Sequence, residues 1–191
     1  MKSIFYSTLI AICLTLPSAQ AKDVSFSLHG EYQTGGDDIA TVEYGGHYDS
    51  TLRVNEGMNF GAGIAIPLFG GLELQSTFGF QTANETAKNG EISWRSLPWE
   101  TSLIAHLSHF LMGGGIVYHV SPKLKSEGDF STIRNIDFDN SLGYQAQIAY
   151  LIETSVGKGL ALGVKYTRID FEKNQIEWNG DSTGFFAKFY F

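Results

Sequence analysis

The chain has 191 residues and carries 20 acidic against 13 basic side chains, which gives a formal net charge of -7. This acidic excess excludes the basic footprint of a nucleic-acid-binding protein. Cys13 is the only cysteine, so the sequence excludes a disulfide framework and a site built from several thiolates.

The N-terminus has the three parts of a secretory signal. Lys2 forms a basic start, residues 4–16 are mostly apolar, and residues 18–21 read Ser-Ala-Gln-Ala, a small-residue cleavage site. We therefore predict a signal peptide over residues 1–21 and a mature domain over residues 22–191. An uncleaved anchor helix is the alternative, but the apolar stretch is shorter than the roughly 20 residues that a spanning helix needs.

The rest of the chain shows a period-two alternation of apolar and polar residues, which predicts β-strands. In the first strand, for example, Val24, Phe26 and Leu28 alternate with Ser25 and Ser27. Each predicted strand is close to the 9–11 residues that a tilted membrane strand requires. The eight predicted strands cover residues 24–33, 58–66, 72–81, 97–106, 110–120, 141–151, 160–171 and 183–191.

The connections between these strands alternate in length. Residues 67–71, 107–109 and 153–159 form short turns, whereas residues 34–57, 82–94 and 121–140 form long loops and residues 172–182 a moderate one. Short turns at one end and long loops at the other are typical of an up-and-down membrane barrel. The sequence therefore predicts an all-β fold, an eight-stranded antiparallel up-and-down transmembrane β-barrel, whose long loops face outward and whose short turns face the periplasm.

Charged residues within the strands support this barrel because they fall on the parity opposite to the apolar set. A charge on the lipid face at mid-membrane costs about 2–4 kcal/mol for Arg or Lys. Arg168 shares parity with the apolar residues, and we expect it either to reach headgroups from the outer strand end or to follow a register shift. The predicted polar cluster of the barrel interior comprises His29, Glu31, Glu73, Glu100, Lys165 and Lys188.

An eight-stranded barrel is just wide enough for its own side chains to fill it. Many glycines share the inward parity, among them Gly61, Gly63 and Gly184, which suits a narrow interior. We therefore predict a hydrogen-bonded plug rather than a proton or ion path. Two aromatic girdles are also expected, an outer one of Tyr32, Tyr118, Tyr144, Tyr166 and Phe171 and an inner one of Tyr150, Phe110, Phe69 and Phe191.

A secreted soluble β-sandwich or lipocalin-like barrel is the rival fold, because it would also show short alternating strands. Such a fold would turn its apolar faces inward and leave the strand charges in solvent. The concentration of glycines on the polar face and the apolar aromatic strand that closes the sequence favour the membrane barrel.

The last strand carries the most specific local pattern, residues 185–191 with the sequence Phe-Phe-Ala-Lys-Phe-Tyr-Phe. It is similar to the C-terminal signal that small Gram-negative outer-membrane β-barrel proteins present to the barrel-assembly machinery. Residues 22–191 as a whole resemble that group, which includes outer membrane proteins A and X, and residues 113–123 and 163–168 resemble porin-family segments. The resemblance implies location in the cell outer membrane and assigns the assembly signal to Phe185, Phe189 and Phe191.

Two short patterns raise the possibility of catalysis on lipid A. His106 and Ser108 resemble the His-x-Ser of lipid A deacylase barrels, but His109 stands where that family has Asn, and the predicted topology puts the pattern on a periplasmic turn. His47, Asp49 and Ser50 match residue types of the lipid A palmitoyltransferase. Residue types do not define a triad without geometry, so we predict no catalytic residues and a non-enzymatic protein, with a lipid A-modifying enzyme or a narrow solute pore as alternatives.

The outer loops are rich in Asp and Glu, but no segment has the ordered spacing of a calcium-binding loop. We predict no metal site and no cofactor. Basic residues of the outer segments are candidates to contact lipopolysaccharide phosphates. The expected partners are therefore outer-membrane lipids and lipopolysaccharide, together with the barrel-assembly machinery during insertion. We expect the protein to be a monomer. The basic candidates for phosphate contact are Arg53, Arg95, Lys123, Lys125 and Arg134.

Overall fold

The computed structural model describes residues 24–44, 48–87, 90–128, 135–154 and 159–191. The predicted signal peptide, residues 1–21, lies outside the described residues and remains a prediction. Within the described ranges, no helix is long and apolar enough to cross a membrane.

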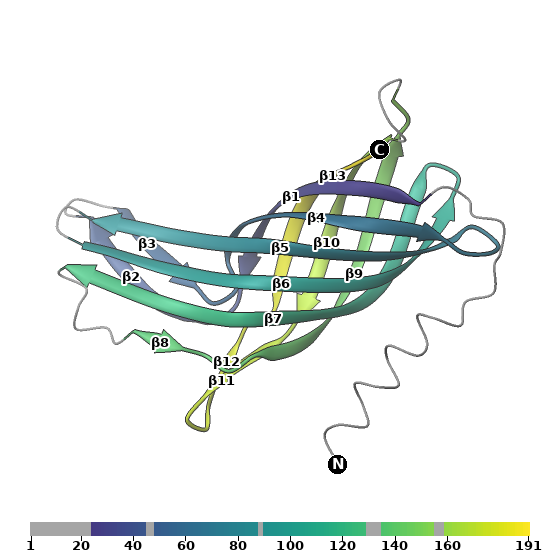
Figure 1. Cartoon of the computed structure of the whole chain (residues 1–191). Helices are drawn as coiled ribbons and strands as arrows, with labels where there is room; N and C mark the ends of the chain where they lie inside the picture. The colour runs from purple at the N-terminus through teal and green to yellow at the C-terminus, as the bar shows by residue number, and fades with distance from the viewer. Residues whose placement is uncertain (1–23, 45–47, 88–89, 129–134, 155–158) are drawn as a thin grey trace, which may run out of the picture.

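Eight strands form a closed antiparallel barrel, and each contains most or all of one predicted strand (Figure 1). The order around the ring is β1-β4-β5-β6-β7-β9-β10-β13, and pairing between β13 and β1 completes it. The predicted fold class is therefore confirmed. The barrel strands are β1 (Ser25–Gly35), β4 (Gly57–Pro67), β5 (Leu72–Ala87), β6 (Gly90–Leu107), β7 (Phe110–Gly128), β9 (Ser141–Ile152), β10 (Gly159–Arg168) and β13 (Ser182–Tyr190).

The seam between the first and last strands is continuous. Leu28 lies opposite Phe189, and Gly35 lies opposite Ser182. Beyond the end of β13, Phe26 and Phe191 exchange two backbone N–H···O=C hydrogen bonds of 3.0 Å each. The backbone groups of the seam are thus paired along the barrel wall, as a bilayer requires.

The apolar residues of the strands face outward. Phe26 and Leu28 on β1 have 58% and 55% of their surface exposed, whereas Ser25 and Ser27 between them are buried. The same alternation continues on the neighbouring strands, where Phe60, Phe78 and Leu103 are exposed. A closed barrel with an apolar outer face and polar residues inside is the arrangement that lipid stabilises. This distribution is the reverse of a soluble β-barrel and rules that alternative out.

Three strands continue past the others at the end opposite to the short turns (Figure 1). We call this end the outer end and the short-turn end the periplasmic end, after the predicted orientation. In the predicted loop 82–94, residues 82–87 instead extend β5 and residues 90–94 extend β6, and β7 runs to Gly128 inside the predicted loop 121–140. The predicted seventh strand, 160–171, is interrupted at Ile169. The further elements at this end are the paired β2 (Asp38–Tyr44) and β3 (Tyr48–Arg53), the paired β11 (Asp170–Lys173) and β12 (Ile176–Asn179), and β8 (Ile136–Asp137) along β7.

A β-bulge lies in β7 where it leaves the barrel. Leu97 of β6 pairs with Val120, but Arg95 pairs with Lys123, so β7 has one extra residue between these two pairs. Ser121 has a φ of 50°, in the left-handed region, which fits a bulge at this point. Because side chains alternate with period two, the extra residue exchanges the inward and outward sets of the strand beyond it.

The outer end of the barrel wall carries exposed tyrosines, as a girdle would require. Tyr32, Tyr144 and Tyr166 are all exposed. Phe171 was predicted to join them, but it is fully buried inside the outer end of the molecule, so this assignment is wrong. Arg168 is exposed at the outer end of β10 opposite Tyr144, and the pairing of β10 shows no register shift. The headgroup explanation for Arg168 therefore fits the structure.

We expect position along β1 to decide the cost of an outward-facing charge. Leu28→Arg places a cation near the middle of the lipid-facing strand and should lower the free energy of unfolding by about 2–4 kcal/mol, whereas Tyr32→Arg, near the outer interface, should cost about 0–1 kcal/mol. Urea unfolding in phospholipid vesicles measures both values. Equal stability of the two variants would contradict the outward orientation of β1 in lipid.

Candidate functional site

Three charged side chains from three separate parts of the ring meet inside the barrel. Lys165 of β10 places its Nζ 2.5 Å from Oε2 of Glu31 on β1 and 2.7 Å from Oε1 of Glu100 on β6. The side chains are 4%, 1% and 10% exposed, respectively. Since these strands are not neighbours, the ion pairs span the interior rather than run along one wall. We call these three residues the central triad.

A second polar group lies on the periplasmic side of the central triad. The Nζ of Lys188 donates to Oε1 of Gln75 at 2.8 Å, and Nε2 of Gln75 lies 2.7 Å from Oε1 of Glu73. The same amide lies 2.9 Å from the hydroxyl of Tyr190. His106 lies 3.4 Å from Glu73 and is partly exposed at the turn end. These contacts run from the buried Lys188 to the partly exposed His106 at the short-turn end of the barrel.

A third polar group lies toward the outer end. His119 of β7 has its Nδ1 3.0 Å from the hydroxyl of Ser96, which donates to Gln81 of β5 at 2.9 Å. On the opposite wall, Asn55 donates to the hydroxyl of Ser182 at 3.0 Å. The first two hydrogen bonds run between the neighbouring strands β5, β6 and β7, and the third joins the segment before β4 to β13.

His29 is the predicted interior residue that the structure does not pair. Its side chain is buried and leans over Gly61, yet neither ring nitrogen has a hydrogen-bond partner among the described residues. The amide of Asn59 on β4 is in the same situation. Buried polar atoms without a protein partner are the usual positions of ordered water in proteins. The predicted interior cluster is therefore brought inside as a whole, but His29 stands apart from its hydrogen-bonded core.

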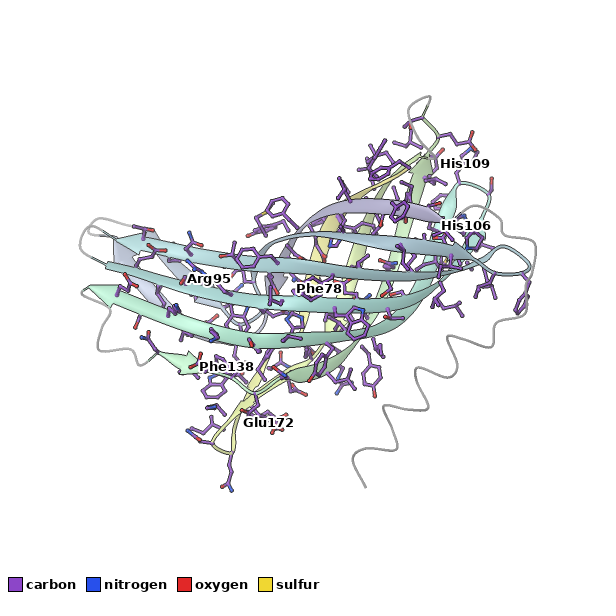
Figure 2. The ribbon with its side chains drawn as sticks, in the orientation of Figure 1. Phe78, Arg95, His106, His109, Phe138 and Glu172 are labelled. Carbon is purple, nitrogen blue, oxygen red and sulfur yellow. The ribbon has the colours of Figure 1, made fainter. Side chains whose placement is uncertain are left out.

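An aromatic core closes the outer end of the molecule. Trp94 packs edge-on against Phe138 and Phe171 with ring centroids 5.2 and 5.1 Å apart, and Phe138 packs against Trp178 at 5.0 Å. Leu52 of β3 and Leu124 of β7 complete this core, so it joins the outward strand extensions to both hairpins. Figure 2 shows Phe138 and Glu172 at this end, far from His106 and His109.

A smaller apolar cluster occupies the periplasmic half of the interior. It contains Ile104 and Leu111 from the wall at the β6–β7 turn and Phe186 from β13. Alanines at positions 65, 149 and 161 leave room for these larger groups. Apolar side chains therefore fill the interior at both ends, with the central triad between them.

Neither sequence pattern for catalysis forms a triad in the described residues. The hydroxyl of Ser108 lies 3.2 Å from Nδ1 of His109, but the two are neighbours on the β6–β7 turn at the end that carries the short turns. His109 stacks on Tyr150 and has no carboxylate partner within the described chain. His47 lies outside the described residues, as do the side chains of Tyr48 and Asp49, so the second pattern has no geometry to report.

The outer acidic residues do not gather into a metal site. In the described part of the chain, no group of three or more His, Cys, Asp or Glu side chains is arranged to hold a metal ion. Arg53 pairs with Asp38, and Lys123 pairs with Asp137. Arg134 lies outside the described residues.

The three phenylalanines of the predicted assembly signal share the outer face of the last strand. Phe185 and Phe191 are 68% and 47% exposed, and Phe189 is half-buried with its ring 5.7 Å from that of Phe191. They thus form an apolar stripe along the lipid-facing side of the seam. Their role in assembly remains a prediction.

Sequence reasoning missed the aromatic core and the outer polar group. A signal for both was present, because Ile92, Trp94 and Ser96 continue the inward parity of Glu100 on β6. Phe171 likewise has the same parity as Lys165. Ile92 and Trp94 fall in the predicted loop 82–94, whereas Phe171 ends the predicted strand 160–171 and was assigned to the outer girdle.

No protein-family model and no curated protein matches this chain. Solved structures do match its fold. Neisserial surface protein A aligns with a TM-score of 0.51 at 9% sequence identity, over 91% of this chain and all of that protein. This chain therefore has the fold of the small outer-membrane β-barrels, and the predicted outer-membrane location agrees with that fold and with the apolar outer face of the barrel.

Two further structures align less closely. Outer membrane protein AlkL gives a TM-score of 0.45 at 12% identity over 92% of this chain and 94% of that protein. The attachment invasion locus protein Ail of Yersinia pestis gives 0.48 at 12% identity over 87% of this chain and 96% of that protein.

The central triad should act as a single unit in stability. Lys165→Met leaves the carboxylates of Glu31 and Glu100 buried without their cation and should cost about 3–5 kcal/mol. Adding Glu31→Gln and Glu100→Gln to that variant should restore most of the loss, because no uncompensated charge then remains. Unfolding by guanidinium in detergent micelles measures these free energies.

Lys173→Met is the matched control for this series. Lys173 pairs with Asp139 at 3.4 Å on the surface, where an ion pair contributes about 0–1 kcal/mol. A Lys165→Met variant no less stable than Lys173→Met would show that the triad does not hold the barrel together.

Proposed function

We propose that this protein is a monomeric, non-enzymatic outer-membrane barrel whose filled interior makes it an anchor and whose outward part meets the envelope surface or an external partner. The observation that carries this proposal is that side chains meet across the interior at successive levels. Phe171 and Trp94 pack at the outer end, Lys165 bridges two walls in the middle, and Phe186 packs with Ile104 below. Such a lumen favours a structural role over conduction.

The outward part of the molecule is suited to recognition because one packed apolar core supports it. We define the outer platform as the extensions of β5, β6 and β7 beyond the bulge together with the hairpins β2–β3 and β11–β12. The aromatic core packs beneath all of these elements. Binding residues are commonly presented on segments that a rigid scaffold positions. The platform thus offers a preformed surface rather than loose loops.

The rival functions can be tested together. Purified protein in planar lipid bilayers should give no resolvable single-channel events, because the triad and the aromatic core obstruct the lumen. Lipid A from cells that make the protein should have the same mass spectrum as lipid A from cells that lack it. Regular channel openings would establish a pore, and a change in acyl-chain mass would establish a lipid A-modifying enzyme; either result would overturn the proposal.

We also propose that Phe185, Phe189 and Phe191 act as the signal for barrel assembly in the cell. Phe191→Ala keeps the backbone hydrogen bonds to Phe26 but removes an exposed ring. The variant should accumulate in the outer membrane at a several-fold lower level while refolding normally into detergent micelles. Heat-modifiable gel mobility measures folding in both settings.

Phe69→Ala is the control for the assembly variant. Phe69 is also a highly exposed aromatic residue at the periplasmic end, but it lies on the β4–β5 turn rather than on the last strand. If both variants reduced accumulation equally, the effect would come from a lost interfacial aromatic residue and not from an assembly signal.

A further inference from the structure

A stripe of basic residues lies on the outer face of β6 and β7 just beyond the membrane-spanning part. Arg95 of β6 and Lys123 of β7 face each other as a cross-strand pair, and Lys125 follows opposite Ser93. Arg95, Lys125 and Ser93 line an open surface cavity of about 210 Å³ together with Glu91 and Glu127. Figure 2 shows Arg95 on the extension of β6. We call Arg95, Lys123 and Lys125 the basic stripe.

The stripe brings like charges together, and only one of its three cations has an ion-pair partner among the described residues. Two cations directly opposite each other on a sheet destabilise the pair. Lys123 has a partner, because its Nζ lies 3.2 Å from Asp137. Arg95 and Lys125 form no ion pair with any described carboxylate, and Glu91 and Glu127 lie opposite each other farther out along the sheet. An anion at Arg95 and Lys125 would supply the counter-charge that no described carboxylate gives them.

The position of the basic stripe along β6 and β7, relative to the apolar part of the same face, identifies the kind of anion. On the same outer face, β6 and β7 present an apolar surface that begins at the turn, with Leu107 and Phe110, and ends at Leu97 and Val120. The intervening strand length matches the 9–11 residues that a tilted strand needs to cross the hydrocarbon core. Arg95 and Lys123 form the first cross-strand pair above this surface. They therefore lie at the level of the lipid headgroups and face the lipid.

We infer that the basic stripe binds the phosphate groups of an outer-leaflet glycolipid, with Arg95 and Lys125 as the principal ligands. The planar guanidinium of Arg95 can donate two parallel hydrogen bonds to one phosphate. Lys125 adds a second cation two residues farther along β7 than Lys123, the cross-strand partner of Arg95. Ser93, which lies opposite Lys125 on β6 and lines the same cavity, can contribute a hydroxyl. This inference rests on the proposed outward orientation of this end of the barrel.

The experiment compares binding of bis-phosphorylated lipid A with binding of its dephosphorylated form, which has the same acyl chains. Native mass spectrometry of the full-length mature protein in detergent micelles measures both dissociation constants. The wild type should prefer the phosphorylated form, and Arg95→Gln with Lys125→Gln should weaken that binding by about 10- to 30-fold. Heat-modifiable mobility on the same samples verifies that each variant is folded, which separates failure of this site from failure of the barrel itself.

The matched control removes the same amount of charge from elsewhere on the platform. Arg53→Gln with Lys173→Gln eliminates two cations that already have Asp partners. Because Asp38 neutralises Arg53, this residue is no longer a candidate for phosphate contact, and the double variant should leave lipid A binding unchanged. Equal losses in both double variants would mean that net charge alone attracts the lipid, and an unchanged preference in the Arg95 and Lys125 variant would mean that the phosphates bind elsewhere. If millimolar inorganic phosphate displaced bound lipid A as effectively as added lipid A does, the site would belong to a free anion. Each of these three results would overturn the inference.

Discussion

The closure of the backbone between β1 and β13 is the constraint from which the rest of the structure follows. An open sheet edge in hydrocarbon would expose N–H and C=O groups that lipid cannot satisfy. Here the strand pairing continues to the two hydrogen bonds between Phe26 and Phe191. Once the ring is closed, alternate side chains must face either lipid or a narrow lumen, and the chemistry of each residue decides which face it can occupy.

The narrow lumen forces its charges to meet and leaves little space between them. A Cβ added at Gly61 would come within 2.5 Å of Cε1 of His29, and one added at Gly184 would collide with the carboxylate of Glu31. Glycines on the inner face therefore provide the volume that the charged side chains occupy. The narrow lumen brings Lys165 against Glu31 and Glu100 and also keeps all three side chains buried. Because buried charges are costly unless they are paired, these ion pairs are necessary for the barrel to be stable.

The sequence predicted what depends on alternation within a single strand and missed what depends on contacts between distant segments. The eight strands and the inward charges follow from parity, because a lipid face excludes charge over a whole strand. The pairing of Lys165 with two carboxylates depends on the ring order and on the stagger between strands, which no local pattern contains. The aromatic core draws Phe138 and Phe171 from segments outside the membrane strands, and the bulge at Ser121 breaks the alternation that would have shown β7 continuing.

The bulge at Ser121 also lets β7 have opposite patterns of inward and outward side chains on its two sides. Below it, β7 turns His119 inward and Ile116 outward, as lipid requires. Above it, Leu124 is buried in the aromatic core and Lys125 is exposed, as a polar surrounding allows. Without the extra residue, the parity of His119 would carry Lys125 inward and Leu124 outward. The bulge therefore marks the level at which the solvent of the outer face changes from hydrocarbon to headgroups, and it is also what turns the lysines of the basic stripe toward the membrane surface.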